Sequence, residues 1–333
     1  MINFDVYYEN NSQKKINKSE NFLITADFKN KIKIVNDIPR FSEAEYTQNF
    51  GDQWSDYSED QFDESDDETY KNLNIARDTL QEVFPIKLEK IQNANILEAG
   101  SGNGRFTYIM LKNGAKVDTF DKSHTVDVLK NNLKKKNYLE TGRVNIAQVD
   151  INNMPYKKNS YDYVVCLHVL QHTPSPEQSI NNLWKMVKPG GALILDHYRF
   201  KIKSLYPPIG GFGNLFRHLV LLLPYKYRRS FSDSFVKFWF PLHWLFRDFA
   251  IIQQILIRLS PVRFSYPWLG LKSKDAYLKK ALMDTHDGST DVYHHTRTIT
   301  RFKKTINKLD KIGEFKVFKG GNGILAWAYK KAF

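Results

Sequence analysis

The feature that most constrains the fold is a regular alternation between residues 95 and 199. Short runs of β-branched and aromatic residues there are followed by longer runs whose apolar residues recur at helical spacing. This alternation predicts a doubly wound α/β domain, in which parallel strands are joined by crossover helices. The predicted strands are 95–99, 116–120, 143–148, 162–167 and 192–198, and the predicted helices lie near 104–113, 125–136 and 176–187.

The end of the chain resumes this pattern. A helix is predicted across residues 298–311, followed by the runs EFKVF and ILAWAY, which the turn-prone KGGNG separates. We expect these two runs to form a closing antiparallel β-hairpin.

Composition sets limits on the class of protein. A chain of 333 residues with 42% hydrophobic residues can bury a sizeable core, as one large domain with additions or as two domains. The single Cys166 excludes an internal disulfide framework and a cysteine-built zinc site, and its apolar strand predicts an inert thiol. The first twenty residues lack the apolar core of a secretory signal, and no run reaches the roughly 18 apolar residues that span a bilayer, so we expect a cytoplasmic protein.

The charge is unevenly distributed along the chain. Residues 52–68 hold nine acidic side chains and no Lys or Arg, whereas residues 199–280 hold fifteen basic and three acidic ones. The second window supplies nearly all of the formal net charge of +13. This excess permits nucleic acid, an anionic membrane surface or an acidic substrate as partner and selects none of them.

The run ILEAGSGNGRF, residues 96–106, follows the first predicted strand and opens the first helix. Glycines there allow a sharp turn and close approach to a ligand. The spacing is Gly100, Gly102, Gly104, and Arg105 stands where nicotinamide- and flavin-binding loops prefer a third glycine. Glu98 would repel a pyrophosphate but suits a cationic ligand. S-adenosylmethionine, which carries a sulfonium and an ammonium and no phosphate, fits that charge.

This E-x-G-x-G-x-G run resembles motif I of the class I S-adenosylmethionine-dependent methyltransferases. The resemblance continues through KVDTFD, NIAQVD, SYDYVVCLHVLQHTPSPE and KPGG, the last of which looks like the turn into the fifth strand. It implies that Asp121 accepts the ribose hydroxyls, and that Asp150 and Ile151 lie beside the adenine. The cofactor-binding positions that we expect are Glu98, Gly100, Gly102, Gly104, Asp121, Asp150, Ile151 and His168. Helix N-caps for the two aspartates, and a buried ionic partner for Glu98, remain alternatives.

The resemblance also implies a fold and a domain organisation. We expect a Rossmann-like sheet of seven mostly parallel strands with helices on both faces and a closing antiparallel hairpin. The predicted parts are an N-terminal accessory segment (1–75), a cofactor-binding core (76–200), an inserted helical cap (201–285) and the C-terminal part of the core (286–333).

The sequence says less about the methyl acceptor than about the cofactor. The nucleobase signature of an Asn or Asp followed by Pro-Pro and an aromatic is missing after the fourth strand, and Cys166 is not followed by the proline of pyrimidine carbon methylases. Small-molecule methyltransferases share a similar H-V-L-x-H-T-P loop, so we expect O-methylation of a small or lipid-linked metabolite. RNA methylation and a non-catalytic, cofactor-binding or membrane-associated scaffold are the alternatives.

His172 is the first candidate for the catalytic base, because imidazole titrates near neutral pH and this loop borders the sulfonium in the family. His197 is the second candidate, with Tyr198 as a substrate contact, because ligands of open α/β sheets lie beyond the carboxyl ends of the strands. A helix-capping or backbone-bonded His172 is the structural alternative.

Two further segments resemble a bacterial subgroup of these enzymes. ALMDTHDGSTDVYHHTRT resembles its acceptor-side segment and makes His286, Tyr293 and His294 candidate substrate contacts, or else a polar loop; its spacing matches no standard metal site. NDIPRFSEAEYTQNFGDQWSDY, residues 36–57, resembles the run before the domain, and Trp54 there either covers the bound ligands or docks the segment on the core. The residues before it contain no cysteine, so any zinc-ribbon-like module would be metal-free.

The insertion contains a helical stripe of apolar residues spaced by three and four: Leu242, Leu245, Phe249, Ile252, Leu256 and Leu259. We expect one continuous amphipathic helix here. It would either pack over the sheet edge and shape the acceptor pocket, lie on an anionic membrane, or bind RNA.

Overall fold

The structure is a computed structural model, and it describes residues 3–26, 29–58, 62–64, 74–201, 205, 211–263, 273–321 and 323–332. The chain divides into two compact units. The first, the α/β unit, comprises Met1–Ser65, Asn72–Arg199 and His295–Phe333, and the second, the helical unit, comprises Asp66–Lys71 and Phe200–His294. The sequence-based boundary at residues 285/286 falls inside one continuous helix, α9 (Lys274–Thr290).

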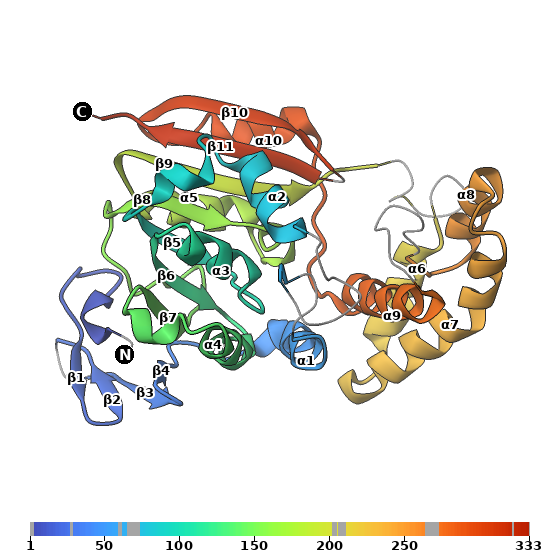
Figure 1. The fold of residues 1–333 in the computed structure, drawn as a ribbon, viewed down its shortest axis with the longest axis horizontal. Helices are drawn as coiled ribbons and strands as arrows, with labels where there is room; N and C mark the ends of the chain where they lie inside the picture. The colour runs from blue at the N-terminus through green and yellow to red at the C-terminus, as the bar shows by residue number, and fades with distance from the viewer. Residues whose placement is uncertain are drawn as a thin grey trace. The chain divides into compact units, whose positions relative to one another are not determined.

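The α/β unit is built on the predicted seven-stranded sheet, in the order β10-β11-β9-β8-β5-β6-β7 (Figure 1). Strands β5 to β9 pair in parallel and the hairpin β10–β11 pairs antiparallel, which confirms the predicted fold. The strand bounds are β5 Asn95–Ala99, β6 Lys116–Asp121, β7 Val144–Gln148, β8 Tyr161–Cys166, β9 Val187–Tyr198, β10 Ile312–Gly320 and β11 Gly323–Lys330.

Helices cover both faces of the sheet, so its central strands are apolar on both sides. The helices are α2 (Ile75–Val83), α3 (Arg105–Lys112), α4 (Thr125–Lys135), α5 (Pro176–Met186) and α10 (Ile299–Ile306). Apolar residues of α2, α3 and α4 form one core cluster with the sheet, and those of α5 and α10 form the other.

The KPGG run lies within β9 instead of preceding it as a turn. Between the pairs Tyr161↔Val187 and Tyr163↔Ala192, β9 advances by five residues while β8 advances by two, so the run forms an irregular bulge. Gly190 has φ +79°, and a Cβ on Gly191 would lie 2.7 Å from the Asp162 carbonyl oxygen. The two glycines therefore permit the bulge.

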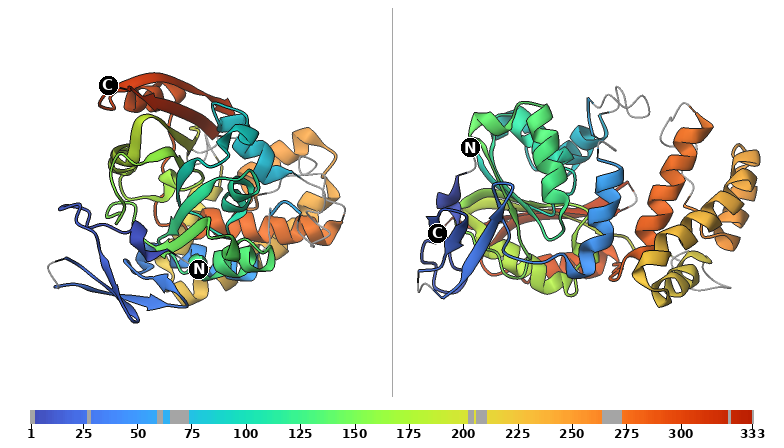
Figure 2. Two further views of the ribbon diagram at one scale, coloured as in Figure 1. Left: turned by 60° about the vertical axis from the view of Figure 1, so that its left-hand side comes forward. Right: turned by 90° about the horizontal axis from the view of Figure 1, so that it is seen from below.

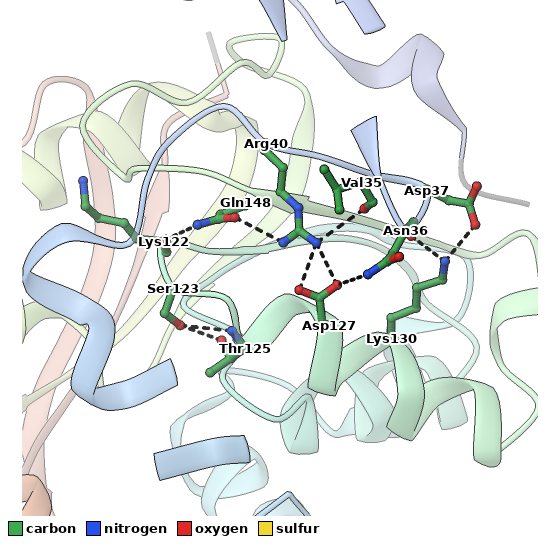
Figure 3. Close-up of polar contacts among 10 residues, drawn as sticks. All are labelled: Val35, Asn36, Asp37, Arg40, Lys122, Ser123, Thr125, Asp127, Lys130 and Gln148. Atoms are coloured by element: carbon green, nitrogen blue, oxygen red, sulfur yellow. Dashed lines mark hydrogen bonds and ion pairs between the residues drawn. The ribbon is translucent and has the colours of Figure 1, made fainter. Parts of the chain in front are cut away.

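The N-terminal segment forms a small antiparallel sheet, β1 (Asn17–Ser19), β2 (Phe22–Ile24), β3 (Lys31–Val35) and β4 (Ile38–Pro39), followed by α1 (Gln48–Asp56) (Figure 2). Arg40 anchors this segment to the core (Figure 3). Its Nη2 lies 2.7 and 2.9 Å from the two carboxylate oxygens of Asp127 on α4, and its Nη1 donates to Gln148 at the end of β7. Phe41 N also donates to the Gln148 carbonyl oxygen at 2.8 Å. The segment is thus fixed to the edge of the large sheet.

The helical unit contains α6 (Gly213–Leu222), α7 (Tyr225–Leu245), α8 (Ala250–Leu259) and α9. The prediction of one continuous helix through the apolar stripe was wrong, because α7 ends at Leu245 and α8 begins at Ala250. The stripe is also not the buried face: Leu256 is 6% exposed, but Leu245 is 64% and Phe249 is 58% exposed. The break has a physical reason. The buried His243 on α7 bonds Gln253 on α8 and Ser260 just beyond it, which requires the chain to turn back.

We expect Arg40→Met to lower the free energy of unfolding by about 1–3 kcal/mol, since it removes charge-assisted hydrogen bonds from a largely buried guanidinium. Denaturant titration would measure this change. Lys130→Met is the matched control, because Lys130 pairs with the exposed Asp37 and its loss should cost about 1 kcal/mol or less. Equal losses for the two variants would contradict an anchoring role for Arg40.

Candidate functional site

The glycine loop joins β5 to α3 in a conformation that side chains other than glycine rarely adopt. Gly100 has φ +80° and Gly104 has φ +90°. A Cβ on Gly100 would lie 2.1 Å from Val169 and one on Gly104 would lie 2.3 Å from Leu129, so neither position has room for a larger residue. The loop is therefore closely packed as well as sharply turned.

This loop forms one wall of a pocket of about 800 Å³, measured with its open mouth, within the α/β unit. Its largely apolar lining with a few polar side chains is typical of a small-molecule site. The N-terminal segment contributes four of the lining side chains. The lining residues are Tyr46, Thr47, Phe50, Trp54, Gly100, Ser101, Gly102, Asn103, Arg105, Phe106, Phe120, Asp121, Lys122, Val149, Ile151, Leu167, His168, Val169, His172 and Thr173.

Asp121, at the end of β6, lies in this pocket and holds the loop. Its Oδ2 accepts from Gly102 N at 3.1 Å, and its Oδ1 accepts from Ser123 N at 2.8 Å and from Ser123 Oγ at 2.7 Å. A carboxylate has about four acceptor sites, so these contacts leave one, on Oδ2, for a ligand hydroxyl. Asp121 is not an N-cap of α4, since His124 occupies that position.

Asp150 does not line the pocket, although its neighbour Ile151 does. Its Oδ2 accepts from Lys122 Nζ at 2.6 Å, and Lys122 also pairs with Glu45 at 3.0 Å. Burial alone would lower the pKa of Lys122, but its bonds to the two carboxylates outweigh burial and raise that pKa. Lys122 therefore stays charged and ties the N-terminal segment to the end of β7. The sequence analysis did not identify it.

Glu98 lies behind the loop rather than in the pocket. It is 2% exposed, and its Oε2 accepts from Thr107 and, at 2.8 Å, from Thr119. Its Oε1 has no hydrogen-bond partner among the residues that the structure describes. Burial raises the pKa of Glu98 to about 7. Glu98 therefore does not contact a ligand in the pocket directly, and its charge would act on a cationic ligand only by longer-range electrostatic attraction.

His168 follows β8 and lines the pocket with a half-exposed imidazole. Asp196, buried in β9, fixes it twice: His168 N donates to Oδ1 at 2.6 Å, and Nδ1 lies 2.8 Å from Oδ2. Burial alone would raise the pKa of Asp196, but the charge and hydrogen bonds of His168 lower it. His168 also has φ +62°, which is uncommon for a non-glycine residue and frequent at functional sites. Asp196 was missed in the sequence, where its only signal was a place near the end of the fifth strand.

His172 also lines the pocket, but it is 8% exposed. Its ring packs edge-on against Phe50, at 4.9 Å between ring centres, and against Tyr198, at 5.4 Å. It does not cap α5, whose N-cap is Ser175. Tyr198 is not a lining residue itself, but its ring contacts that of His172, which is one.

His197 lies outside the pocket. Successive side chains of a strand point to opposite faces, so His197 faces away from Asp196 and Tyr198. It is fully buried, its Nδ1 lies 3.1 Å from the Tyr198 carbonyl oxygen, and its Nε2 accepts from Arg297 at 3.2 Å. Burial lowers the pKa of His197 to about 4. His197 is therefore a buried side chain bonded to Arg297, away from the lining of the pocket.

The remaining candidates fall into two groups. Trp54 lines the pocket beside Gly102 and under the Arg105 guanidinium. His286, Tyr293 and His294 belong to the helical unit and are not lining residues. Among the described residues, no group of three His, Cys, Asp or Glu side chains is arranged to hold a metal ion.

Residues 97–195 match a family model described as a methyltransferase domain. The ubiquinone biosynthesis O-methyltransferase of Coxiella burnetii (strain RSA 493 / Nine Mile phase I) is 27% identical over 136 residues, which is 38% of this chain and 56% of that protein. The enzyme of the same name from Dechloromonas aromatica (strain RCB) is 28% identical over 173 residues, 48% of this chain and 70% of that protein. The chain thus spans about half the length of the Coxiella relatives.

Among solved structures, a putative S-adenosylmethionine-dependent methyltransferase from Listeria monocytogenes aligns with 77% of this chain and 98% of its own, at 14% identity and a TM-score of 0.43. A methyltransferase from Aquifex aeolicus aligns with 79% of this chain and 93% of its own, at 13% identity and a TM-score of 0.41.

The matched domain contains the glycine loop, Asp121 and the strands that carry them. Residues 97–195 of this chain therefore form a methyltransferase domain, and S-adenosylmethionine is its cofactor.

We expect Asp121→Ala to weaken S-adenosylmethionine binding about tenfold or more, because it removes a charged acceptor and the anchor of the loop. Calorimetry would give both affinities. Glu89→Ala, an exposed carboxylate outside the pocket, is the control and should bind normally. Unchanged affinity in Asp121→Ala, or tight NAD binding by the parent, would contradict the assignment of the pocket.

The buried Glu98 predicts a pH dependence of stability. The pKa of Glu98 is about 7 in the folded protein and 4.5 ordinarily, so folding favours the protonated carboxyl group. Its stabilising contribution to the free energy of unfolding is fully present below pH 4.5 and is lost as the pH rises through about 7. The loss amounts to about 3 kcal/mol. Glu98→Gln should abolish this component, and melting curves between pH 5 and 8 would show the two proteins diverging in slope. Parallel curves would mean that Glu98 is ionised throughout.

Proposed function

We propose that the protein transfers a methyl group from S-adenosylmethionine to an oxygen atom of a small or lipid-linked metabolite, in the cytoplasm. One observation carries the proposal: a buried carboxylate, Asp196, holds the imidazole of His168 in the pocket that the glycine loop and Asp121 form. A hydroxyl acceptor must lose a proton as it is methylated, and a carboxylate-oriented imidazole is suited to remove it. The names of the curated relatives are consistent with an oxygen acceptor.

The lining residues suggest how the cofactor would be held. Asp121 would accept a ribose hydroxyl, and Ile151 and Phe120 would provide apolar surface for the adenine. Bound there, S-adenosylmethionine supplies a methyl group activated by its positively charged sulfur. The protein then contributes proximity, alignment and a base.

His168 is the base in this proposal. In the neutral tautomer that donates Nδ1–H to Asp196, Nε2 carries no proton and can accept one from the acceptor hydroxyl. The Asp196 carboxylate then stabilises the imidazolium, which later releases the proton to solvent. His172, the base expected from sequence, lines the same pocket but packs between two aromatic rings, so it remains the second candidate.

Two other functions remain as alternatives. RNA methylation would need an acceptor site for a base, and the nucleobase signature is missing from the loop after β8. A non-catalytic scaffold would retain the fold without turnover, and the Asp196–His168 pair is the observation that argues against it.

We expect purified protein, incubated with S-adenosylmethionine carrying a labelled methyl group and with cell extract, to label a small or lipid-soluble product. Mass spectrometry would identify the acceptor and the methylated atom. Labelling of RNA alone, or no labelled product although the cofactor binds, would contradict the proposal.

The same assay separates the two imidazoles. His168→Asn should lower turnover about 100-fold or more with little change in cofactor affinity, whereas His172→Asn should mainly lower the melting temperature. Asp196→Asn should shift the pH profile of turnover. If His172→Asn alone abolishes turnover at normal affinity, then His172 is the base.

A further inference from the structure

The exposed apolar side chains are concentrated in the helical unit. Of the seventeen large hydrophobic residues that the described part of the chain leaves exposed, fifteen belong to this unit, and the other two are Phe22 and Val35. Single exposed apolar residues are normal on a protein surface, but a concentration of this kind marks an interaction site.

Nine of these fifteen residues form a stripe on each of three helices, which we call the apolar stripes. Residues spaced by three and four lie on one side of a helix, and here that side faces away from the core of the unit. The stripes are Leu215, Leu219 and Leu222 on α6; Phe238, Leu242 and Leu245 on α7; and Ile251, Ile255 and Leu259 on α8.

The stripes are not the core-facing sides of these helices. The core-facing sides are occupied by Phe216 and Val220 on α6, Val236 and Phe240 on α7, and Leu256 on α8, all of which are buried. Each helix therefore has an apolar inner side and a second apolar side without a covering partner among the described residues of the unit.

A buried polar cluster fixes the rotation of α8 against α7. His243 is fully buried, its Nδ1 lies 2.9 Å from Gln253 Oε1, and its Nε2 lies 2.6 Å from Ser260 Oγ. Gln253 Nε2 donates in turn to the His243 carbonyl oxygen at 2.8 Å. Turning α8 to bury its stripe would break these bonds within a desolvated site. The exposure of Ile251, Ile255 and Leu259 is thus built into the unit.

Basic side chains accompany the stripes. Lys237 precedes Phe238 on α7 and Arg258 precedes Leu259 on α8, and both are exposed. Nearby, Lys226 lies over the ring of the exposed Tyr227 at 4.8 Å. The segment 199–280 as a whole holds fifteen basic and three acidic residues. Aliphatic stripes flanked by Lys, Arg and Tyr suit a bilayer interface with anionic headgroups.

The charge also discriminates against other partners. A second copy of this chain would bring two strongly basic segments together, which is unfavourable. RNA bases stack on aromatic rings, whereas eight of the nine stripe residues are Leu or Ile.

No helix among the described residues is long and apolar enough to cross a membrane.

We propose that the helical unit docks on an anionic lipid bilayer, with α6, α7 and α8 lying in the interface and their stripes among the acyl chains. The docking does not depend on the reaction. Its functional meaning, that the acceptor is a lipid-linked molecule taken from the membrane, rests on the proposed function.

Co-sedimentation of the full chain with vesicles tests this proposal without cofactor or acceptor. We expect binding to vesicles of phosphatidylcholine with phosphatidylglycerol, little binding to phosphatidylcholine alone, and release by salt. Ile251→Glu and Ile255→Glu should each lower the bound fraction about tenfold or more at unchanged melting temperature. Val35→Glu, an exposed apolar residue of the α/β unit, is the matched control and should bind normally.

Charge reversal gives a second test. Lys237→Glu with Arg258→Glu should weaken vesicle binding about tenfold, whereas Lys304→Glu with Lys308→Glu, on exposed residues of the α/β unit, should not. Arg228 is unsuitable for such a test, because it donates to the carbonyl oxygens of Leu221 and Leu223 at the end of α6.

Three results would overturn docking: no vesicle binding, equal losses in the test and control variants, or a stable dimer that Ile251→Glu dissociates. If vesicle binding is absent, RNA binding by the same protein would identify nucleic acid as the partner instead. Failure of methyl transfer alone leaves docking intact and counts only against the proposed function.

Discussion

The site depends on one topological constraint, which is that β6, β5, β8 and β9 run parallel and adjacent. Their carboxyl ends therefore meet at one edge of the sheet, although the residues there are far apart in sequence. The glycine loop after β5, Asp121 at the end of β6, His168 after β8 and Asp196 near the end of β9 all lie at this edge. No local interaction would bring an imidazole from one strand end to a carboxylate on the next.

Hydrogen bonds convert this proximity into a defined geometry. Asp121 fixes the glycine loop through Gly102 N, and Asp196 fixes both the backbone and the ring of His168. Both carboxylates accept bonds from backbone N–H groups as well as from side chains, so the loops beside the pocket are held at the level of the main chain. Such pre-organisation is what a methyltransferase core can contribute, because its cofactor is already activated.

The sequence predicted the sheet and the cofactor loop well, because both leave local signals. Strand and helix periodicity gave elements within a residue or two at most boundaries, and the loop glycines are required by φ angles and by near neighbours. Long-range pairings left no such signal. The Lys122–Asp150 pair, the burial of Glu98 behind the loop and the Asp196–His168 contact arise from strand adjacency, and the inward orientation of His197 depends on strand register. The apolar spacing in residues 242–259 is a local signal that predicted the wrong structure. It continues across the break between α7 and α8, where the chain turns back and the buried His243 contacts Gln253.

The anchoring of Arg40 to Gln148 joins residues 108 positions apart in the chain. Four lining side chains of the pocket, Tyr46, Thr47, Phe50 and Trp54, follow this anchor directly. During synthesis on the ribosome, residues 36–58 emerge well before β7, the strand against which they dock. We expect this wall of the pocket to assemble late, because its aromatic residues have no native surface to cover until β7 has emerged and because closing so long a loop adds an entropic cost.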